Sequence, residues 1–345
     1  MTSIIRVAVT GVGGGVGQSI LKALSLSALP VEVHAVDIQP FSAGLYRAAH
    51  AQVLPPLEKG DNAGIWRAWI KDKGIQVLIP GSDHDLTALS RVREAWAADG
   101  CAVLVSDAAL VDICRDKART VEALAGFGLP HADSVSDVSL SDARTWAMRR
   151  YPFVLKPRDG FASRGVQVIE DEESLAYFFP RTRNPMLQVY LGDRKNPQEF
   201  TCSVFVDGGG EVIGTFMARR DLSGGATYRA EVGSGPDIDD LLRRIGRSFR
   251  PRGPMNVQLR MTQNGPVPFE LNIRCSGTSA IRAHFGFNEP EMLLRHYYLG
   301  ERLPPAKARQ GYAFRYWNEV FLEGVSAHDI SLAPQGVMGA VRAWP

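Results

Sequence analysis

Hydrophobic and polar positions in the first 110 residues alternate between short apolar runs and amphipathic segments. The runs have the length of buried strands, and the segments between them have helical periodicity. This βαβ rhythm is typical of an α/β domain with an open, mostly parallel sheet and helices on both faces. The expected strands are Ile4–Thr10, Val31–Asp37, Gln76–Pro80 and Ala102–Ser106, and the expected helices are Gly17–Ser25, Ala63–Lys73 and Asp85–Asp99.

The pattern changes at about residue 150, where strands follow one another with few helices between them. This arrangement predicts an α+β unit with antiparallel strands. Leu222–Gly235 shows no periodicity and is expected to be a mobile loop that acts as a lid. The expected strands are Tyr151–Lys156, Gly165–Glu170, Met186–Tyr190, Glu199–Val206, Glu211–Arg219, Met255–Met261 and Val267–Arg274, and the expected helices are Asp112–Phe127, Glu172–Phe179, Ile238–Ser248 and Glu289–Leu299.

Composition narrows the class of protein. The chain has 345 residues, with 39 basic and 37 acidic side chains and a net charge of +2. Such balance gives no electrostatic argument for a nucleic-acid or membrane partner, and no apolar run approaches the roughly 20 residues of a membrane span. No signal peptide precedes the first strand. The four cysteines are scattered, so we expect reduced thiols and a cytoplasmic location.

The strand Val267–Arg274 carries the clearest chemistry. Because strand side chains alternate, Glu270, Asn272 and Arg274 share one face. A carboxylate and an amide oxygen are ligands suited to Mg²⁺ carrying phosphates, and an arginine beside them is suited to a phosphoryl group in transfer. The opposite face, expected in the core, consists of Phe269, Leu271 and Ile273.

The preceding strand adds Gln258 to the same polar face only if the turn between the two strands has the correct number of residues. A three-residue turn at Gln263–Gly265, with Gly265 left-handed, places Gln258 opposite Glu270. A two-residue Asn-Gly turn places Leu259 there instead. The alternative interpretation is a solvated sheet face with surface ion pairs.

A second basic group ends the apolar strand Tyr151–Lys156. Lys156 is suited to phosphate oxygens, and the Gly/Ser-containing segment 158–166 that follows can close over them with its N–H groups. The alternative is an ordinary hairpin whose lysine is solvated.

The N-terminal glycine loop gives a weaker signal. Gly11, Gly14 and Gly17 follow a strand and open a helix, and Asp37 ends the next strand, as in a dinucleotide site. The strict GxGxxG spacing fails. The favoured interpretation is that these glycines serve a tight turn and close helix–strand packing.

These pieces, in this order, resemble the ATP-grasp superfamily, and in particular its carbamoyl-phosphate-synthetase-like branch. The resemblance covers nearly the whole chain. It implies a Rossmann-like pre-ATP-grasp domain at 1–110 and an ATP-grasp domain at 111–300, followed by a tail at 301–345 packed on it. Within the second domain it implies a small lid subdomain at about 120–190 and a larger subdomain at about 191–300.

The resemblance also implies roles for single residues. Lys156 and Arg274 are the expected catalytic residues, and Gln258, Glu270 and Asn272 the expected Mg²⁺ ligands. The expected ATP-binding residues are Lys117, Lys156, Gly160, Ser163, Arg164, Gly165, Gln188, Val189, Tyr190 and Glu199.

The implied reaction is ATP-dependent ligation of a carboxylate to an amine through an acyl phosphate, releasing ADP and phosphate. Gln258 departs from the usual acidic ligand, and the single grasp unit without a glutamine-hydrolysing domain argues against carbamoyl phosphate as product. Arginine suits carboxylate substrates, and the candidates are Arg219, Arg229 and Arg282.

Other functions stay open at this point. One is a kinase or a thiol or hydroxyl ligase. Another is a nicotinamide-dependent oxidoreductase built on the glycine loop, and a third is a non-catalytic nucleotide-binding regulator. The expected partners are a small-molecule carboxylate and an amine, with a homodimer possible by analogy with relatives.

Overall fold

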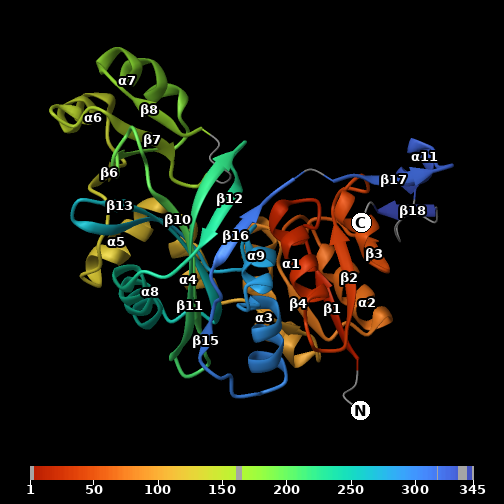
Figure 1. Cartoon of the computed structure of the whole chain (residues 1–345). Helices are drawn as coiled ribbons and strands as arrows, with labels where there is room; N and C mark the ends of the chain where they lie inside the picture. The colour runs from red at the N-terminus through yellow and green to blue at the C-terminus, as the bar shows by residue number, and fades with distance from the viewer. Residues whose placement is uncertain (1–3, 161–164, 317, 333–339, 344–345) are drawn as a thin grey trace.

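A five-stranded parallel sheet forms the N-terminal part of the computed structural model, which describes residues 4–160, 165–316, 318–332 and 340–343 (Figure 1). In spatial order its strands are β3 (His50–Val53), β2 (Val31–Asp37), β1 (Ile5–Val9), β4 (Val77–Ile79) and β5 (Ala102–Val103). The accompanying helices are α1 (Gly15–Ser25), η1 (Ala43–Arg47), α2 (Asn62–Lys73) and α3 (Asp83–Ala98). The predicted α/β arrangement is confirmed. The edge strand β3 was not predicted, because His50–Val53 has little apolar character.

Helices cover both faces of this sheet, as the alternation of strand side chains requires. Val7 and Val9 of β1 pack with Ile20 of α1 on one face. Ala8, between them, packs on the other face with Trp66 of α2. Period two along a parallel strand thus divides the apolar residues between two cores.

A larger, mostly antiparallel sheet of seven strands forms the centre of the molecule. Its main path runs β14 (Gly265–Asn272), β13 (Gly253–Thr262), β10 (Glu199–Val206), β11 (Val212–Ser223), β12 (Ala226–Val232) and β16 (Gly311–Phe314), while β15 (Ala306–Lys307) pairs with β11. Its accompanying helices are α8 (Pro236–Phe249), α9 (Ser279–His284), α10 (Glu289–Leu293) and the π-helical turn η3 (Leu294–Tyr298). Leu242 and Ile245 of α8 are fully buried beside Val204 of β10.

A four-stranded antiparallel sheet projects above the larger one (Figure 1). Its order is β6 (Ser134–Ser136), β9 (Pro185–Val189), β7 (Phe153–Pro157) and β8 (Gln167–Ile169), with helices α6 (Leu140–Ala147) and α7 (Glu172–Phe178) and the turn η2 (Phe179–Arg181). Phe153, Leu155 and Leu187 form its own small core with both helices. This separate core makes the projecting unit a compact body of its own, in the region where the sequence predicts a lid subdomain.

The hairpin of β13 and β14 has the predicted pairing, but by another route. The turn has two residues, because Thr262 pairs with Gly265. A β-bulge next to Leu259 then shifts the register, so that Gln258 lies opposite Glu270 after all. The prediction of a three-residue turn is wrong, whereas the juxtaposition that it was meant to explain is confirmed.

Three further predictions of local structure are wrong. Asp112–Phe127 is two helices, α4 (Ala108–Arg115) and α5 (Lys117–Gly126), because the Asp116 carboxylate caps the start of α5. Glu289–Leu299 changes from α-helix to π-helix after Leu293. Leu222–Gly235 is mostly the β11–β12 hairpin, whose pairing extends to Ser223 and Ala226.

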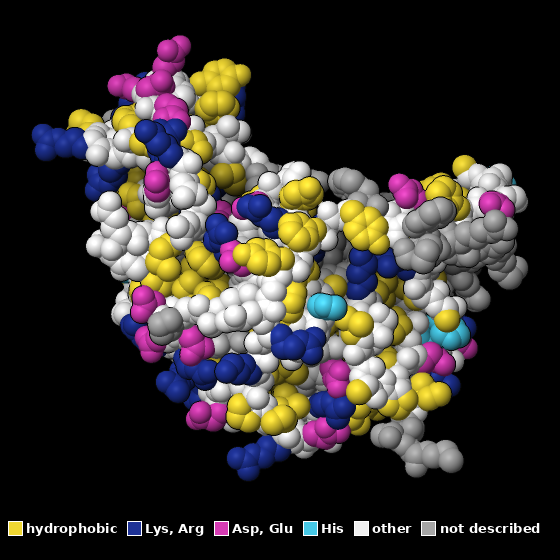
Figure 2. Space-filling view, viewed as in Figure 1, with side chains coloured by type: hydrophobic (Ala, Val, Ile, Leu, Met, Phe, Trp, Pro, Cys, Tyr) yellow, Lys and Arg dark blue, Asp and Glu magenta, His cyan; other side chains and the backbone are white. Residues whose placement is uncertain are grey.

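The C-terminal segment returns to the N-terminal sheet. After β16 the chain forms β17 (Val320–Glu323), α11 (Ala327–Leu332) and β18 (Ala340–Ala343). Strand β17 packs near η1, and Figure 1 shows this end of the chain beside the parallel sheet. Basic and acidic side chains are interspersed over the face in Figure 2, as the balanced charge predicts. Among the described residues, no helix is both long and apolar enough to cross a membrane.

A buried ion pair links the loop after β14 to the larger sheet. Arg282 of α9 is 0% exposed and donates to Glu289 (2.5 Å) and to Asn256 (2.6 Å). Glu289 is also fully buried and accepts from Ser203 at 2.5 Å. Arg282 was predicted to bind a substrate carboxylate. That prediction is wrong, because its guanidinium lies in the interior and is already bound to protein groups.

Replacing Arg282 with methionine will lower the free energy of unfolding by about 3–5 kcal/mol, because it leaves the Glu289 carboxylate buried without its cation. The matched control is Arg243→Met, which removes a partly exposed ion pair with Asp239 and is expected to cost only roughly 0.5 kcal/mol. Urea denaturation measures both. Equal losses in the two variants would contradict a structural role for Arg282.

Candidate active site

A cavity lies where the four-stranded sheet meets the seven-stranded one. Its lining comes from segments far apart in the sequence: the start of α5, the facing strands of the two sheets, and the loop after β7. The lining residues are Lys117, Val154, Lys156, Pro157, Gly160, Val166, Gln188, Val189, Leu191, Glu199, Arg220, Leu222, Gln258, Arg260, Phe269 and Glu270. Predicted phosphate, nucleotide and metal residues therefore converge on one site.

Lys156, on β7, is 5% exposed and donates to the Gln188 side-chain oxygen of β9 at 2.8 Å. Burial, helped by the charge of the nearby Lys117 and opposed by that of Glu270, lowers the pKa of Lys156 to about 7. The Gln188 side-chain nitrogen is buried without a hydrogen-bond partner among the described residues. The unpaired Gln188 amide nitrogen, buried beside Lys156, indicates that a polar ligand binds in this cavity.

Lys117 is held at the first position of α5 by its neighbours. The Asp116 carboxylate caps the helix and also accepts from Arg158 at 2.6 Å. Lys117 donates to the Gly160 carbonyl at 2.5 Å, which places it at the base of the loop after β7. Burial lowers the pKa of Lys117, and Glu270 opposes that shift. Two lysines and one carboxylate thus share the same end of the cavity.

The predicted metal ligands lie together on the β13–β14 hairpin. The Asn272 amide nitrogen donates to Glu270 at 3.3 Å, which leaves the Asn272 oxygen for another partner. The Gln258 oxygen accepts from Arg220 at 2.8 Å. Glu270 and Asn272 therefore present oxygen donors to a cation, whereas Gln258 is engaged by a guanidinium.

Glu199, one of the predicted ATP-binding residues, is bound by two arginines. Its carboxylate accepts from Arg220 at 2.6 Å and from Arg260 at 3.0 Å, with 10% of the side chain exposed. The sequence suggested Arg220 as a possible carboxylate-binding arginine and placed Arg260 on the polar face of its strand, but it did not predict that either would pair with Glu199. The inward position of Arg220 could have been predicted. Strand side chains alternate, so Arg220 lies on the same face of β11 as the buried Phe216 and Ala218.

Apolar side chains close the cavity from several sides. Phe269 was predicted to enter the core, but it sits at the bulge of β14 and lines the cavity next to Glu270. A flat apolar slot with a few polar groups suits a nucleobase. The other apolar lining residues are Val154, Val166, Val189, Leu191 and Leu222.

Strand β9 carries the predicted ATP-binding residues Gln188 and Val189, and one of its backbone donors is already in use. The Val189 N–H donates to the Asp133 carbonyl at 2.9 Å. Leu191, just beyond β9, also lines the cavity. Tyr190 lies between them and stacks beneath Arg260, whose guanidinium carbon is 5.0 Å from the ring centre.

Arg274, the predicted catalytic arginine, faces the N-terminal sheet. Its guanidinium is bidentate to Asp83 at the start of α3, at 2.6 and 3.1 Å. Burial raises the pKa of Asp83, but Arg274 more than offsets this and brings the pKa below its usual value. Neither residue lines the cavity, but the charge of Asp83 acts on Lys117, which does.

Several predicted residues lie elsewhere. Arg219 pairs with Glu231 at 2.6 Å, and Arg229 pairs with Asp221 at 2.5 Å. Neither arginine lines the cavity, because β11 and β12 turn these side chains to the other face of the sheet. Gly165 follows the loop after β7 with φ +73°. Ser163 and Arg164 lie outside the described residues.

The glycine loop after β1 is explained by close packing. A side chain on Gly17 would come within 2.5 Å of the Gly11 carbonyl. The Gly13 N–H donates to Asp37 at 2.7 Å, and the Gly14 N–H donates to the Gly11 carbonyl at 3.0 Å. These two loop donors have protein partners, which favours the packing interpretation of the motif over a pyrophosphate site.

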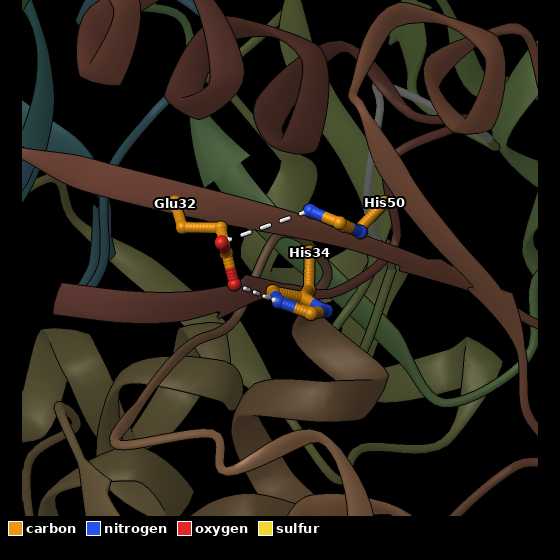
Figure 3. A group of neighbouring side chains, drawn as sticks. All are labelled: Glu32, His34 and His50. Carbon is orange, nitrogen blue, oxygen red and sulfur yellow. Dashed lines mark hydrogen bonds and ion pairs between the residues drawn. The ribbon is translucent and has the colours of Figure 1, made fainter. Parts of the chain in front are cut away.

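A group of Glu32, His34 and His50 lies on β2 and β3, outside this cavity (Figure 3). Glu32 accepts from His34 at 3.0 Å and from Arg6 at 3.0 Å. The two imidazole rings stack at 4.6 Å with 15° between their planes. Because nitrogen lone pairs lie in the ring planes, two stacked rings do not converge on one ion, and Arg6 already supplies the cation. An ion-paired network explains the group.

Comparison with protein families agrees with this geometry. Residues 181–320 match the family described as "ATP-grasp in the biosynthetic pathway with Ter operon". For this region of the chain, the match confirms the ATP-grasp resemblance expected from the sequence. A curated relative, "Uncharacterized protein y4rH" of Sinorhizobium fredii (strain NBRC 101917 / NGR234), is 28% identical over 187 residues. The match spans 48% of this chain and only 37% of that protein.

Solved structures share the fold. The biotin carboxylase domain of 2-oxoglutarate carboxylase from Hydrogenobacter thermophilus, in complex with MgADP, ADP and bicarbonate, has a TM-score of 0.71 and 16% identity, covering 90% of this chain and 74% of that one. N5-carboxyaminoimidazole synthetase from Staphylococcus aureus, complexed with ADP, has a TM-score of 0.70 and 13% identity, covering 88% and 80%. At 16% and 13% identity, this likeness establishes the fold that the resemblance implied.

Binding of MgATP will weaken as the pH rises above 7, because the Lys156 ammonium must be present to meet a phosphate. With the pKa of Lys156 at about 7 in the free protein, the Kd will rise up to about tenfold per pH unit between about pH 7.5 and 9. Calorimetry in buffers of different ionisation enthalpy measures the accompanying proton uptake. Lys156→Arg keeps its charge, so its Kd should stay flat over this range. A wild-type Kd equally flat would contradict the argument.

Proposed function

We propose that this protein is an ATP-dependent carboxylate–amine ligase that forms an amide through an acyl phosphate and releases ADP and phosphate. The observation that carries the proposal is the convergence of Lys117, Lys156 and Glu270 on one cavity with an apolar slot. Phosphoryl transfer needs positive charge and in-line positioning more than covalent chemistry from the protein.

The residues of the cavity fit MgATP. The orphan donor of Gln188 and the backbone beyond Val189 lie beside the apolar slot, where a base would sit. Glu270 and Asn272 are the oxygen donors for Mg²⁺, which would neutralise phosphate charge when bound. The solved structures named above contain ADP or MgADP in the same fold.

The roles of the protein groups follow from their positions. Lys156 and Lys117 would hold phosphate oxygens as point charges, since both Nζ atoms are buried near the same carboxylate. Arg274 would contact the transferred group only by giving up part of its bidentate contact with Asp83. The apolar lining at Val166, Leu222 and Phe269 would help to exclude water, which an acyl phosphate requires.

Competing functions differ in which substrate completes the reaction. A kinase, or a thiol or hydroxyl ligase, would use the same lysines and Glu270. A nicotinamide-dependent oxidoreductase is disfavoured, because the Gly13 and Gly14 N–H groups are already bound within the protein. A non-catalytic regulator has no use for a lysine whose pKa burial lowers to about 7.

The test is ADP release from MgATP against pooled carboxylic acids and amines, with Glu270→Gln alongside. We expect ADP only when an acid and an amine are both present, and a fall of roughly 100-fold or more in Glu270→Gln, the scale of losing one electrostatic group at a reacting centre. The control is Glu231→Gln, at a carboxylate that pairs with Arg219 outside the cavity. It should keep wild-type activity.

Two results would overturn the proposal. ADP formed with an acid or an alcohol alone would favour a kinase. ADP formed equally by Glu270→Gln and wild type would remove the hairpin from the chemistry.

A further inference from the structure

A second cavity, of about 650 Å³, lies at the carboxyl ends of the parallel strands. It is lined by the turn after β1, the segments after β2 and β3, and the start of α3. The strand order changes direction here, because the chain places β2 on one side of β1 and β4 on the other. Open α/β sheets bind ligands at this position, and the volume is that of a small-molecule site.

Two carboxylates reach the floor of this cavity on either side of one glycine turn. A side chain added at Gly11 would lie 3.1 Å from Asp85 Oδ2, and one added at Gly13 would lie 3.2 Å from Asp37 Oδ2. Gly11, Gly13, Asp37 and Asp85 all line the cavity, so both carboxylates border the same space.

Only neutral groups are hydrogen-bonded to these carboxylates. Asp37 accepts from the N–H groups of Gly13 and Gln39, at 2.7 and 3.0 Å. Asp85 accepts from the hydroxyls of Thr10 and Ser82, at 2.8 and 2.6 Å.

Asp37 is 7% exposed. In the described part of the chain, neither Asp37 nor Asp85 forms an ion pair with a lysine, arginine or histidine. Burial raises the pKa of Asp85 and the charge of Asp37 adds to that shift, while the hydrogen bonds from Ser82 and Thr10 and the charge of His84, which also lines the cavity, oppose it. Two desolvated carboxylates at one floor have a strong electrostatic need for a cation.

The remaining walls exclude an anionic ligand and favour an apolar one. Lys59 is the only lysine or arginine in the lining, and Glu58 adds a third carboxylate. Ile38 and Phe41 line the cavity with 47% and 60% of their surface exposed. A phosphate would meet three carboxylates, and the turn's Gly13 and Gly14 N–H groups are already donated within the protein.

We propose that this cavity binds a ligand with a protonated amino group and an uncharged, apolar body. The ammonium lies between Asp37 and Asp85, and the body rests on Ile38 and Phe41. The further identification of this ligand as the amine-bearing substrate rests on the ligase function proposed above.

The two cavities are joined by α3. Ser82 and Asp85 line the second cavity, and Asp83, between them, holds Arg274 by two hydrogen bonds. The charge of Asp83 also acts on Lys117 of the first cavity. A ligand bound against the start of α3 would therefore be separated from the residues of the first cavity by the Asp83–Arg274 ion pair.

The test uses three probes that share a body and differ in charge: phenethylamine, 2-phenylethanol and 3-phenylpropanoate. Binding to the full chain is measured at neutral pH without ATP, by calorimetry and ligand-observed NMR. We expect phenethylamine to bind best and 3-phenylpropanoate worst. Asp85→Asn should weaken phenethylamine by about tenfold, the scale of one charge-assisted hydrogen bond, and leave 2-phenylethanol unchanged. Asp72→Asn, at an exposed carboxylate, is the control and should match wild type.

Folding is checked by retained MgATP binding in Asp85→Asn. The proposal is overturned if the alcohol or the acid binds as well as the amine, or if Asp85→Asn leaves phenethylamine binding unchanged. No binding of any probe up to about 20 mM, far weaker than a specific site gives, overturns it as well. Because ATP is absent, this result is independent of the ADP-release test of the ligase.

Discussion

One ion pair joins the two halves of this protein at its candidate active site. Arg274 follows the hairpin that carries Glu270 and Asn272, and Asp83 begins a helix of the parallel sheet, 191 residues away in the sequence. The contact is bidentate and largely buried, so its geometry is fixed more tightly than that of a surface pair. This contact ties the end of the β13–β14 hairpin to the start of α3, where Ser82 and Asp85 line the second cavity.

The charged groups of the first cavity are only partly neutralised by one another. Glu199 is satisfied by two arginines, whereas Lys156 meets only a neutral amide oxygen. The first pairing stabilises the wall of the cavity, and the second leaves a buried cation short of a negative partner. A bound polyphosphate would supply it, which makes the free protein electrostatically strained at the point where the ligand has to bind. The second cavity has the opposite imbalance, since within the described residues Asp37 and Asp85 form no ion pair.

Much of the fold was predictable, because period-two and helical patterns are local. The parallel sheet, the strand Glu199–Val206 and the polar face at Glu270 and Asn272 all followed from alternation. What failed depended on pairing between distant residues. The bulge beside Leu259 is set by register against Pro268, and no local pattern reports it. The predicted carboxylate-binding arginines failed for a similar reason, since Arg219 and Arg220 differ only in which face of β11 they occupy. Arg282 could not be placed without knowing that Glu289 would be buried beside it.

The route of the chain after α10 has a consequence for how the protein is made. Strand β16 pairs with the edge of the large sheet at β12, and β15 pairs with β11. Strands β11 and β12 therefore lack these partners until residues 306–314 have been synthesised. At roughly 5–20 residues per second on a ribosome, the unpaired edge persists for several seconds. An open strand edge is a template for pairing with other chains. All the residues that line the first cavity are therefore synthesised before the strands that complete the large sheet. A nascent chain stalled before residue 306 would contain these residues but leave the edge of the sheet open to aggregation.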